Sequence, residues 1–138
     1  MKTLYIIIGF VILIVFGSIY QYYRLKKIAT MRGAADICTY ARSFDYRNID
    51  TKIMRAVFEK VQEWAGEFDG KPFPVKADDD FDRIYQMDPD DLDDIYYEVA
   101  NELGISTERA EDNPYYDKVK SVKELVLFLH NQQKIDNA

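Results

Sequence analysis

The chain of 138 residues contains one cysteine and one histidine, which limits the chemistry it can support. Cys38 has no second cysteine with which to form an internal disulfide, in agreement with a reducing compartment. No histidine is close to Cys38 in the sequence, so we interpret it as a small apolar residue rather than a nucleophile. His130 has no nearby cysteine partner, and a surface role near a helix end is favoured over catalysis. The sequence therefore predicts no catalytic residue and no enzyme.

Acidic residues are absent from residues 1–35, and residues 4–20 carry no charge of either sign. With Tyr22 and Tyr23 added, the apolar run reaches the roughly 20 residues that an α-helix needs to cross a bilayer. A cleaved signal peptide is the alternative, but its apolar region is usually shorter and ends in small residues, whereas this run ends in SIYQYYRLKK. We therefore expect residues 1–23 to form an uncleaved transmembrane anchor, with residues 4–23 in the membrane.

Basic residues are concentrated on the C-terminal side of this run. Four follow it and one precedes it: Arg24, Lys26, Lys27 and Arg32, against Lys2. The positive-inside rule then predicts a single-pass membrane protein with its soluble part in the cytoplasm. The basic cluster is expected to face lipid headgroups. Residues 24–48 are interpreted as a juxtamembrane tether, and the sequence leaves open whether it packs on the domain that follows.

The alternation of apolar and polar residues that marks a half-buried strand is not found in the sequence. Apolar residues recur instead at helical spacing in three segments, and this predicts an all-α domain over residues 49–138. We expect a small bundle of three long helices, with a possible short fourth. The second long helix should begin at Asp88 and Pro89 and end at Gly104. Ser121 and Glu124 form a capping-box pair at the start of the last one.

Acidic residues dominate residues 67–98, which contain twelve acidic and three basic side chains. Such a surface repels nucleic acid and anionic lipid, so nucleic-acid binding is excluded from the prediction. The acids are densest in the stretch MDPDDLDDIYYEV, residues 87–99. One or two would suffice to favour the helix dipole, so the excess indicates a solvated acidic surface or a docking face. Calcium is disfavoured because no glycine turns the segment and the ligand alternation breaks at Leu92, so no metal is expected.

The candidate partner-binding residues are the acids and the tyrosine that begin this helix. They are Asp88, Asp90, Asp91, Asp93, Asp94, Tyr97 and Glu98. Their charge predicts a basic protein as the partner.

Two short motifs resemble those of acyl carrier proteins. Asp90-Asp91-Leu92 resembles the D-S-L motif at which carriers enter their second helix, and residues 121–125, SVKEL, resemble the start of their closing helix. The resemblance covers about residues 49–132 and implies a carrier-like helical fold, similar also to an uncharacterised bacterial carrier-like family. Asp91 stands where carriers have the serine that holds phosphopantetheine, so the resemblance implies a carrier fold without the prosthetic group. The loop before the motif is longer than the usual carrier loop.

Together these observations predict a membrane-anchored, non-catalytic, carrier-like protein without a cofactor that docks a basic partner through an acidic helix face. One alternative is an accessory that recruits an acyl- or lipid-processing enzyme to the membrane. Another is a structural module without a specific partner.

Overall fold

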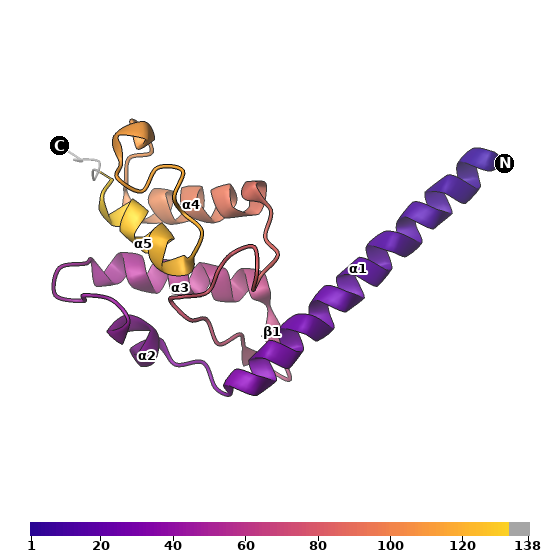
Figure 1. The fold of residues 1–138 in the computed structure, drawn as a ribbon, viewed down its shortest axis with the longest axis horizontal. Coiled ribbons are helices and arrows are strands. Elements are labelled where there is room, and N and C mark those ends of the chain that lie inside the picture. Colours follow the sequence, from indigo (N-terminus) through magenta and orange to yellow (C-terminus); the bar gives the residue numbers. More distant parts are fainter. Residues whose placement is uncertain (133–138) are drawn as a thin grey trace. The chain divides into compact units, whose positions relative to one another are not determined.

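The N-terminal part of the protein is one long helix. The computed structural model describes residues 1–132, and the chain forms two compact units, Met1–Gly33 and a second that begins at Ala34. Helix α1 (Lys2–Arg32) makes up almost all of the first unit (Figure 1). It is long and apolar enough to cross a membrane. The helix continues without a break from the apolar run through the basic cluster, and ends where Gly33 adopts a φ of 81°.

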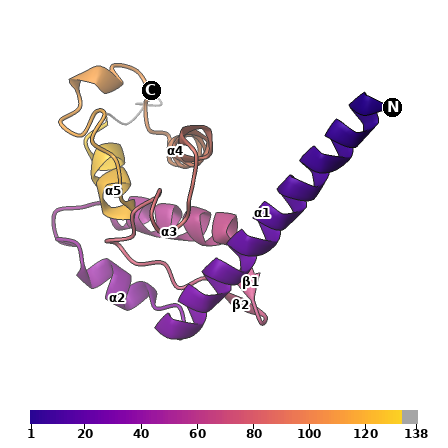
Figure 2. The same cartoon turned by 45° about the vertical axis from the view of Figure 1, so that its right-hand side comes forward.

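The second unit is mostly helical, as the sequence predicts. Its helices are α2 (Ile37–Arg42), α3 (Thr51–Ala65), α4 (Pro89–Leu103) and α5 (Val122–His130), with a short 3-10 helix η1 (Ala110–Asp112). Helix α3 packs against α2, α4 and α5. Figures 1 and 2 show α2 and α4 on opposite sides of α3. The unit is thus organised around α3, and α2 and α4 contribute to opposite sides of its surface.

The helix boundaries follow from local capping chemistry. The Asp50 carboxylate accepts a hydrogen bond from the Lys52 N–H at 2.9 Å and begins α3. At α5 the Ser121 hydroxyl accepts from the Glu124 N–H at 3.3 Å, and the Glu124 carboxylate accepts from the Ser121 N–H at 3.1 Å. This confirms the predicted capping box. Gly104 ends α4 in the left-handed conformation, also as predicted.

One element corrects the all-α prediction. Strands β1 (Glu67–Phe68) and β2 (Lys71–Pro72) pair antiparallel in a two-residue-per-strand hairpin. The turn residues Asp69 and Gly70 both have positive φ, 54° and 74°. An Asp-Gly pair is favoured in such turns because their twist matches that of the strands. The strands are too short to show alternation, so the turn dipeptide was the only available sequence signal.

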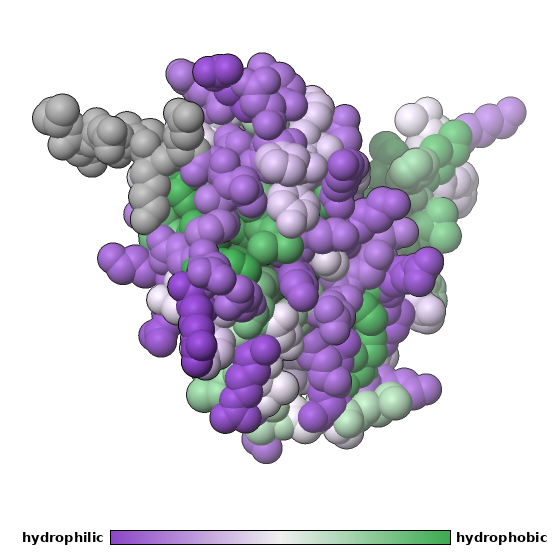
Figure 3. Space-filling view, turned by 60° about the vertical axis from the view of Figure 1, so that its left-hand side comes forward, coloured by the Kyte–Doolittle hydropathy of each residue, from purple (hydrophilic) through white to green (hydrophobic). Residues whose placement is uncertain are grey.

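The core of the second unit lies between α3 and the other elements, and part of the expected tether contributes to it. Tyr40 and Phe44 are buried. The Tyr40 hydroxyl donates to the Met54 carbonyl at 3.0 Å, and its ring centroid lies 4.9 Å from that of Phe58. Residues 37–44 therefore pack on α3, which the sequence had left open. On the face drawn in Figure 3, hydrophilic residues dominate and apolar residues are visible in gaps between them.

Candidate functional site

The predicted partner-binding residues lie along the first three turns of α4. Asp88, Asp90, Asp93, Asp94 and Glu98 are exposed, Asp91 is half-buried, and Tyr97 is 55% exposed. Within residues 1–132 the five aspartates of this set form no ion pair. The carboxylates are therefore available to an external cation, and they repel one another across one helix entry.

The start of α4 differs from the prediction in one respect. Asp88 occupies the N-cap position with extended backbone, and Pro89 is the first helical residue, as predicted. The Asp88 carboxylate, however, makes no capping hydrogen bond within the described chain. The helix start is defined instead by the fixed φ of Pro89 and by Asp90 and Asp91, whose charges interact favourably with the helix dipole. Asp88 is thus an exposed surface charge.

The candidate residues divide between two faces of α4. Asp88, Asp93 and Tyr97 line a groove, together with the neighbouring Leu92 and Tyr96. The remaining four candidates are not part of its wall: Asp90, Asp91, Asp94 and Glu98. The structure therefore brings three of the seven predicted residues together in a concave site and leaves the other four outside it.

The groove has a volume of about 890 Å³ and is bounded by α4, α5 and the two loops that precede these helices. Its walls combine apolar side chains with a mostly acidic rim. The apolar part is Phe81, Met87, Leu92, Val119, Leu125 and Phe128, with the Tyr96 ring; the charged part is Asp80, Asp82, Asp88, Asp93 and Asp117 with Arg83 and Lys120. Five carboxylates against two cations give the rim a negative potential next to an apolar surface.

Main-chain hydrogen bonds hold the two loops of the groove together. The Phe81 N–H donates to the Lys120 carbonyl at 2.8 Å, and the Lys123 N–H donates to the Ala77 carbonyl at 2.9 Å. Asp80 supports this arrangement locally, since its carboxylate accepts hydrogen bonds from the backbone N–H groups of Asp82 and Arg83, at 2.8 and 2.9 Å. The groove is therefore a built feature of the fold, rather than a gap between mobile side chains.

One hydroxyl in the groove wall is buried and has no hydrogen bond to the residues that the structure describes. Tyr96 is 8% exposed, and its hydroxyl has no partner among residues 1–132. Burial raises the pKa of this phenol, an effect that the nearby Gln132 amide only partly opposes. The Gln132 amide is itself engaged, because it donates to the Ser106 carbonyl at 3.1 Å and accepts from the Asn113 side chain at 2.8 Å. A buried donor without an acceptor is costly in an otherwise satisfied fold.

Glu98 has a partner within the domain. Its carboxylate lies 3.3 Å from the Lys60 ammonium of α3. The hydrogen bond that the Lys60 ammonium donates to Glu98 and the charge of Glu63 raise the pKa of Lys60. Glu98 therefore connects α4 to α3, and an external cation would have to compete with Lys60 for it.

Sequence reasoning missed a buried acid outside α4. Asp79 is 3% exposed, and its carboxylate accepts from the Tyr85 hydroxyl at 2.7 Å and from the Lys76 N–H at 2.9 Å. It belongs to the acidic run that sequence analysis treated as surface. No local signal distinguishes Asp79 from its neighbours Asp78 and Asp80, because only tertiary packing places one of the three inside.

No set of three or more histidine, cysteine or acidic side chains converges into a metal site within the described residues. No protein-family model matches the chain, and no significant match was found among curated proteins or solved structures. The acyl-carrier resemblance therefore stays a prediction from the motifs named above.

Proposed function

We propose that the chain is a non-catalytic, single-pass membrane protein whose second unit docks a basic partner protein at the entry of α4. The observation that carries this proposal is the site itself, where four exposed aspartates without an ion pair in residues 1–132 adjoin an apolar groove: Asp88, Asp90, Asp93 and Asp94. The acids attract and orient a cationic segment, and the apolar floor receives a side chain next to that cation.

The partner segment that fits this site is basic and also carries an apolar anchor. Charge at a rim mainly accelerates association and selects partners, whereas buried apolar contact slows dissociation.

The α1 helix is the anchor in this proposal. Its uncharged run and the basic residues that follow support a membrane-spanning helix with the second unit on the cytoplasmic side. The protein should then stay in the membrane fraction after alkaline carbonate and high-salt washing. Protease added to the cytoplasmic side should digest the second unit. Release of residues from about 30 onward as a soluble, exported protein would contradict the proposal.

A carrier-like fold without carrier chemistry is the finer part of the proposal. The order of α3, α4 and α5, the Asp90-Asp91-Leu92 helix entry and the capping box at α5 support it. Asp91 offers a carboxylate where a carrier offers a hydroxyl, so phosphopantetheine cannot be attached there through the usual phosphodiester.

The docking site is tested by partner capture with the full chain in detergent, at low and high salt. Asp93→Asn with Asp94→Asn should weaken capture at low salt and leave the fold as stable or slightly more so, because a repulsion is relieved. The matched control is Glu108→Gln with Glu111→Gln, which changes the net charge equally at two other exposed positions.

Leu92→Ala separates groove docking from simple charge attraction. Leu92 is a half-exposed part of the groove floor, so its truncation should weaken capture even at high salt. Capture that is insensitive to salt and unchanged in the Asp93/Asp94 variant would show that α4 is not the docking site. Equal losses in the control variant would show a response to net charge alone.

A further inference from the structure

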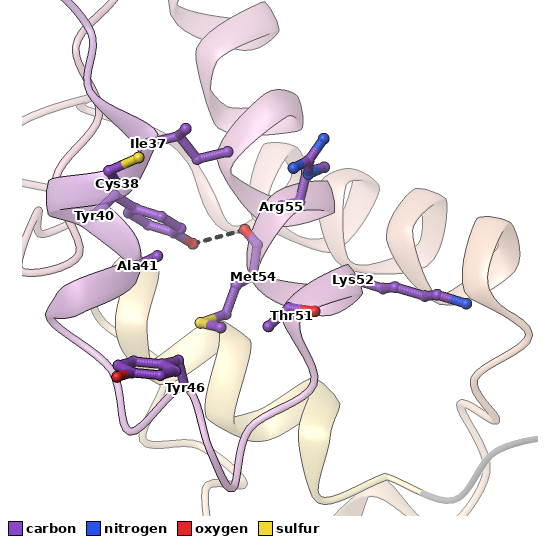
Figure 4. A pocket seen from close by; sticks show the side chains of 9 residues that line it. All are labelled: Ile37, Cys38, Tyr40, Ala41, Tyr46, Thr51, Lys52, Met54 and Arg55. Atoms are coloured by element: carbon purple, nitrogen blue, oxygen red, sulfur yellow. Dashed lines mark hydrogen bonds between the residues drawn. The ribbon is translucent and has the colours of Figure 1, made fainter.

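A second cavity lies on the other side of α3, between α2 and the first turns of α3. Its volume is about 510 Å³. Ile37, Tyr40, Tyr46 and Met54 provide an apolar lining. Figure 4 shows Ile37, Tyr40 and Met54 between the two helices and Tyr46 on the loop that joins them. Tyr46 is 54% exposed. The cavity is therefore an open apolar depression with a tyrosine at its edge, which is the kind of residue favoured where an apolar layer meets water.

The surface around this depression is the basic part of the second unit. Its exposed cations are Arg42, Arg47, Lys52 and Arg55. Lys52 and Arg55 are part of the cavity wall, and in Figure 4 the Lys52 side chain points away from α2. Neither forms an ion pair within residues 1–132.

The acids of the same segment are engaged in local hydrogen bonds. Asp36 accepts from the Cys38 and Thr39 N–H groups, and Asp50 accepts from the Lys52 N–H. Asp45 accepts from the Asn48 side-chain amide. These hydrogen bonds occupy part of the acceptor capacity of the three carboxylates, and the four exposed cations outnumber them on this segment.

Charge is distributed unevenly across the second unit. Residues 34–55 contain four basic and three acidic side chains, whereas residues 56–132 contain eight basic and twenty acidic ones. Helices α2 and α4 lie on opposite sides of α3 (Figures 1 and 2). The cationic depression and the acidic α4 entry therefore face different directions. An anionic surface would attract the first and repel the second, and both forces favour the same orientation.

The short connection between the helices limits how far α2 can lie from the C-terminal end of α1. Four residues, 33–36, separate the last residue of α1 from the first residue of α2. A connection of this length spans at most roughly 18 Å when extended. The inference thus rests on the proposed anchor, but not on the proposed docking at α4.

We propose that the cationic depression formed by α2 and the start of α3 binds the anionic headgroup layer of the bilayer that α1 enters. Lys52 and Arg55 contact lipid phosphates, and the apolar lining with Tyr46 lies at the interface. The net negative charge of the whole unit does not prevent this, because salt screens the surface potential of the headgroups with a decay length of about 8 Å, so that the nearest face experiences most of it. The contact holds the acidic α4 entry away from the membrane.

The test uses the full chain in lipid nanodiscs with an environment-sensitive fluorophore on Cys38. Cys38 is the only cysteine, is exposed, and belongs to the cavity wall. In discs of phosphatidylcholine with phosphatidylserine, the label should shift to the blue and be protected from a water-soluble quencher. Discs of phosphatidylcholine alone, or high salt, should abolish both effects. A label at Asp94→Cys in a Cys38→Ser background should stay exposed in every case.

The variant Lys52→Glu with Arg55→Glu should lower the equilibrium ratio of the bound to the unbound orientation about 25-fold or more, since each cation near an anionic surface strengthens binding about fivefold. The control Lys118→Glu with Lys120→Glu changes the net charge equally on the acidic side and should leave the signal intact. Trp64 fluorescence verifies that each variant is folded. Hydrogen exchange of residues 37–55 in unlabelled protein, compared between the two disc types, provides a readout without the fluorophore.

An equal signal in neutral and anionic discs would overturn the proposal, as would equal losses in the two charge variants. Membrane extraction of the chain by carbonate would instead contradict the anchor, so the two failures are distinguishable.

Discussion

The buried pair formed by Asp79 and Tyr85 offers the sharpest test of how the groove loop is held. Both side chains are almost fully buried, and the Tyr85 hydroxyl donates to the carboxylate at 2.7 Å. The Asp79 carbonyl accepts from the Val122 N–H at 3.0 Å, at the first residue of α5. The pair therefore stabilises the contact between the loop and α5 on which the groove depends.

The perturbation is Tyr85→Phe, which removes one hydroxyl and keeps the ring. The ring packs edge-on against Phe73 and Trp64, with centroids 5.5 and 6.2 Å away, and this packing should persist. A hydrogen bond to a charged group contributes about 1.5–3 kcal/mol. The carboxylate keeps the Lys76 N–H as a donor, so a loss of about 2 kcal/mol in the free energy of unfolding is expected.

The assay is urea unfolding of the full chain in detergent, followed by the fluorescence of Trp64. This is the only tryptophan, and its contact with Tyr85 makes it a direct reporter. Tyr116→Phe is the control, because Tyr116 is 46% exposed and its hydroxyl loss should change stability by less than about 0.5 kcal/mol. A double-mutant cycle with Asp79→Ala isolates the pairwise energy. Equal effects of the two tyrosine variants, or a coupling energy near zero, would refute the reasoning.

Three further predictions concern other residues of the second unit. Ser121→Ala should cost about 1 kcal/mol in unfolding experiments because it removes the cap of α5, whereas Asp88→Ala should cost less than about 0.5 kcal/mol since its carboxylate caps nothing; a reversed order would contradict this. Burial raises the pKa of Tyr40, so as the pH rises the unfolded chain loses the phenol proton before the folded chain does. The free energy of unfolding should therefore fall by about 1.4 kcal/mol per pH unit above pH 10. Unfolding measured between pH 8 and 11 should show a correspondingly shallower fall in Tyr40→Phe. Intact mass after incubation with coenzyme A and a carrier transferase should show no phosphopantetheine on the unmutated chain. Labelling of Asp91→Ser would show a carrier-like helix entry. Labelling of the unmutated chain would contradict the proposal of a carrier-like fold without the prosthetic group.

The helices of the second unit were predictable because each one satisfies several independent requirements at once. In α5 the apolar spacing and the Ser121–Glu124 capping box agree, and in α4 the Pro89 start and the Gly104 end agree. Such local signals act within a few residues and need no knowledge of the rest of the fold. The long apolar run of α1 was predictable for the same reason, since its length and lack of charge are properties of one segment, whereas the continuation of the helix to Arg32 was not predicted.

The features that the sequence could not supply all depend on contacts between distant segments. Asp79 is buried and Asp78 is exposed, although both stand in the same acidic run. The difference arises because the loop before α4 forms main-chain hydrogen bonds with residues 120–123. The groove is a product of the same long-range pairing. Its walls could therefore not be assembled from the spacing of Asp88, Leu92 and Tyr96 on α4 alone.

The acids of α4 are best explained by what they do not contribute to the fold. Asp90 and Asp94 are one helical turn apart, and like charges at this spacing destabilise a helix by a few tenths of a kcal/mol. Asp88 makes no capping bond, and within residues 1–132 none of these three forms an ion pair. One or two acids are enough to interact favourably with the dipole at a helix entry. The other aspartates therefore lower the stability of the helix without forming a stabilising contact within the described residues. Local choices that oppose stability are expected where a surface serves binding. The position of these acids beside an apolar groove, and on the opposite side of α3 from the cationic depression, is consistent with a domain whose two faces serve two different surroundings.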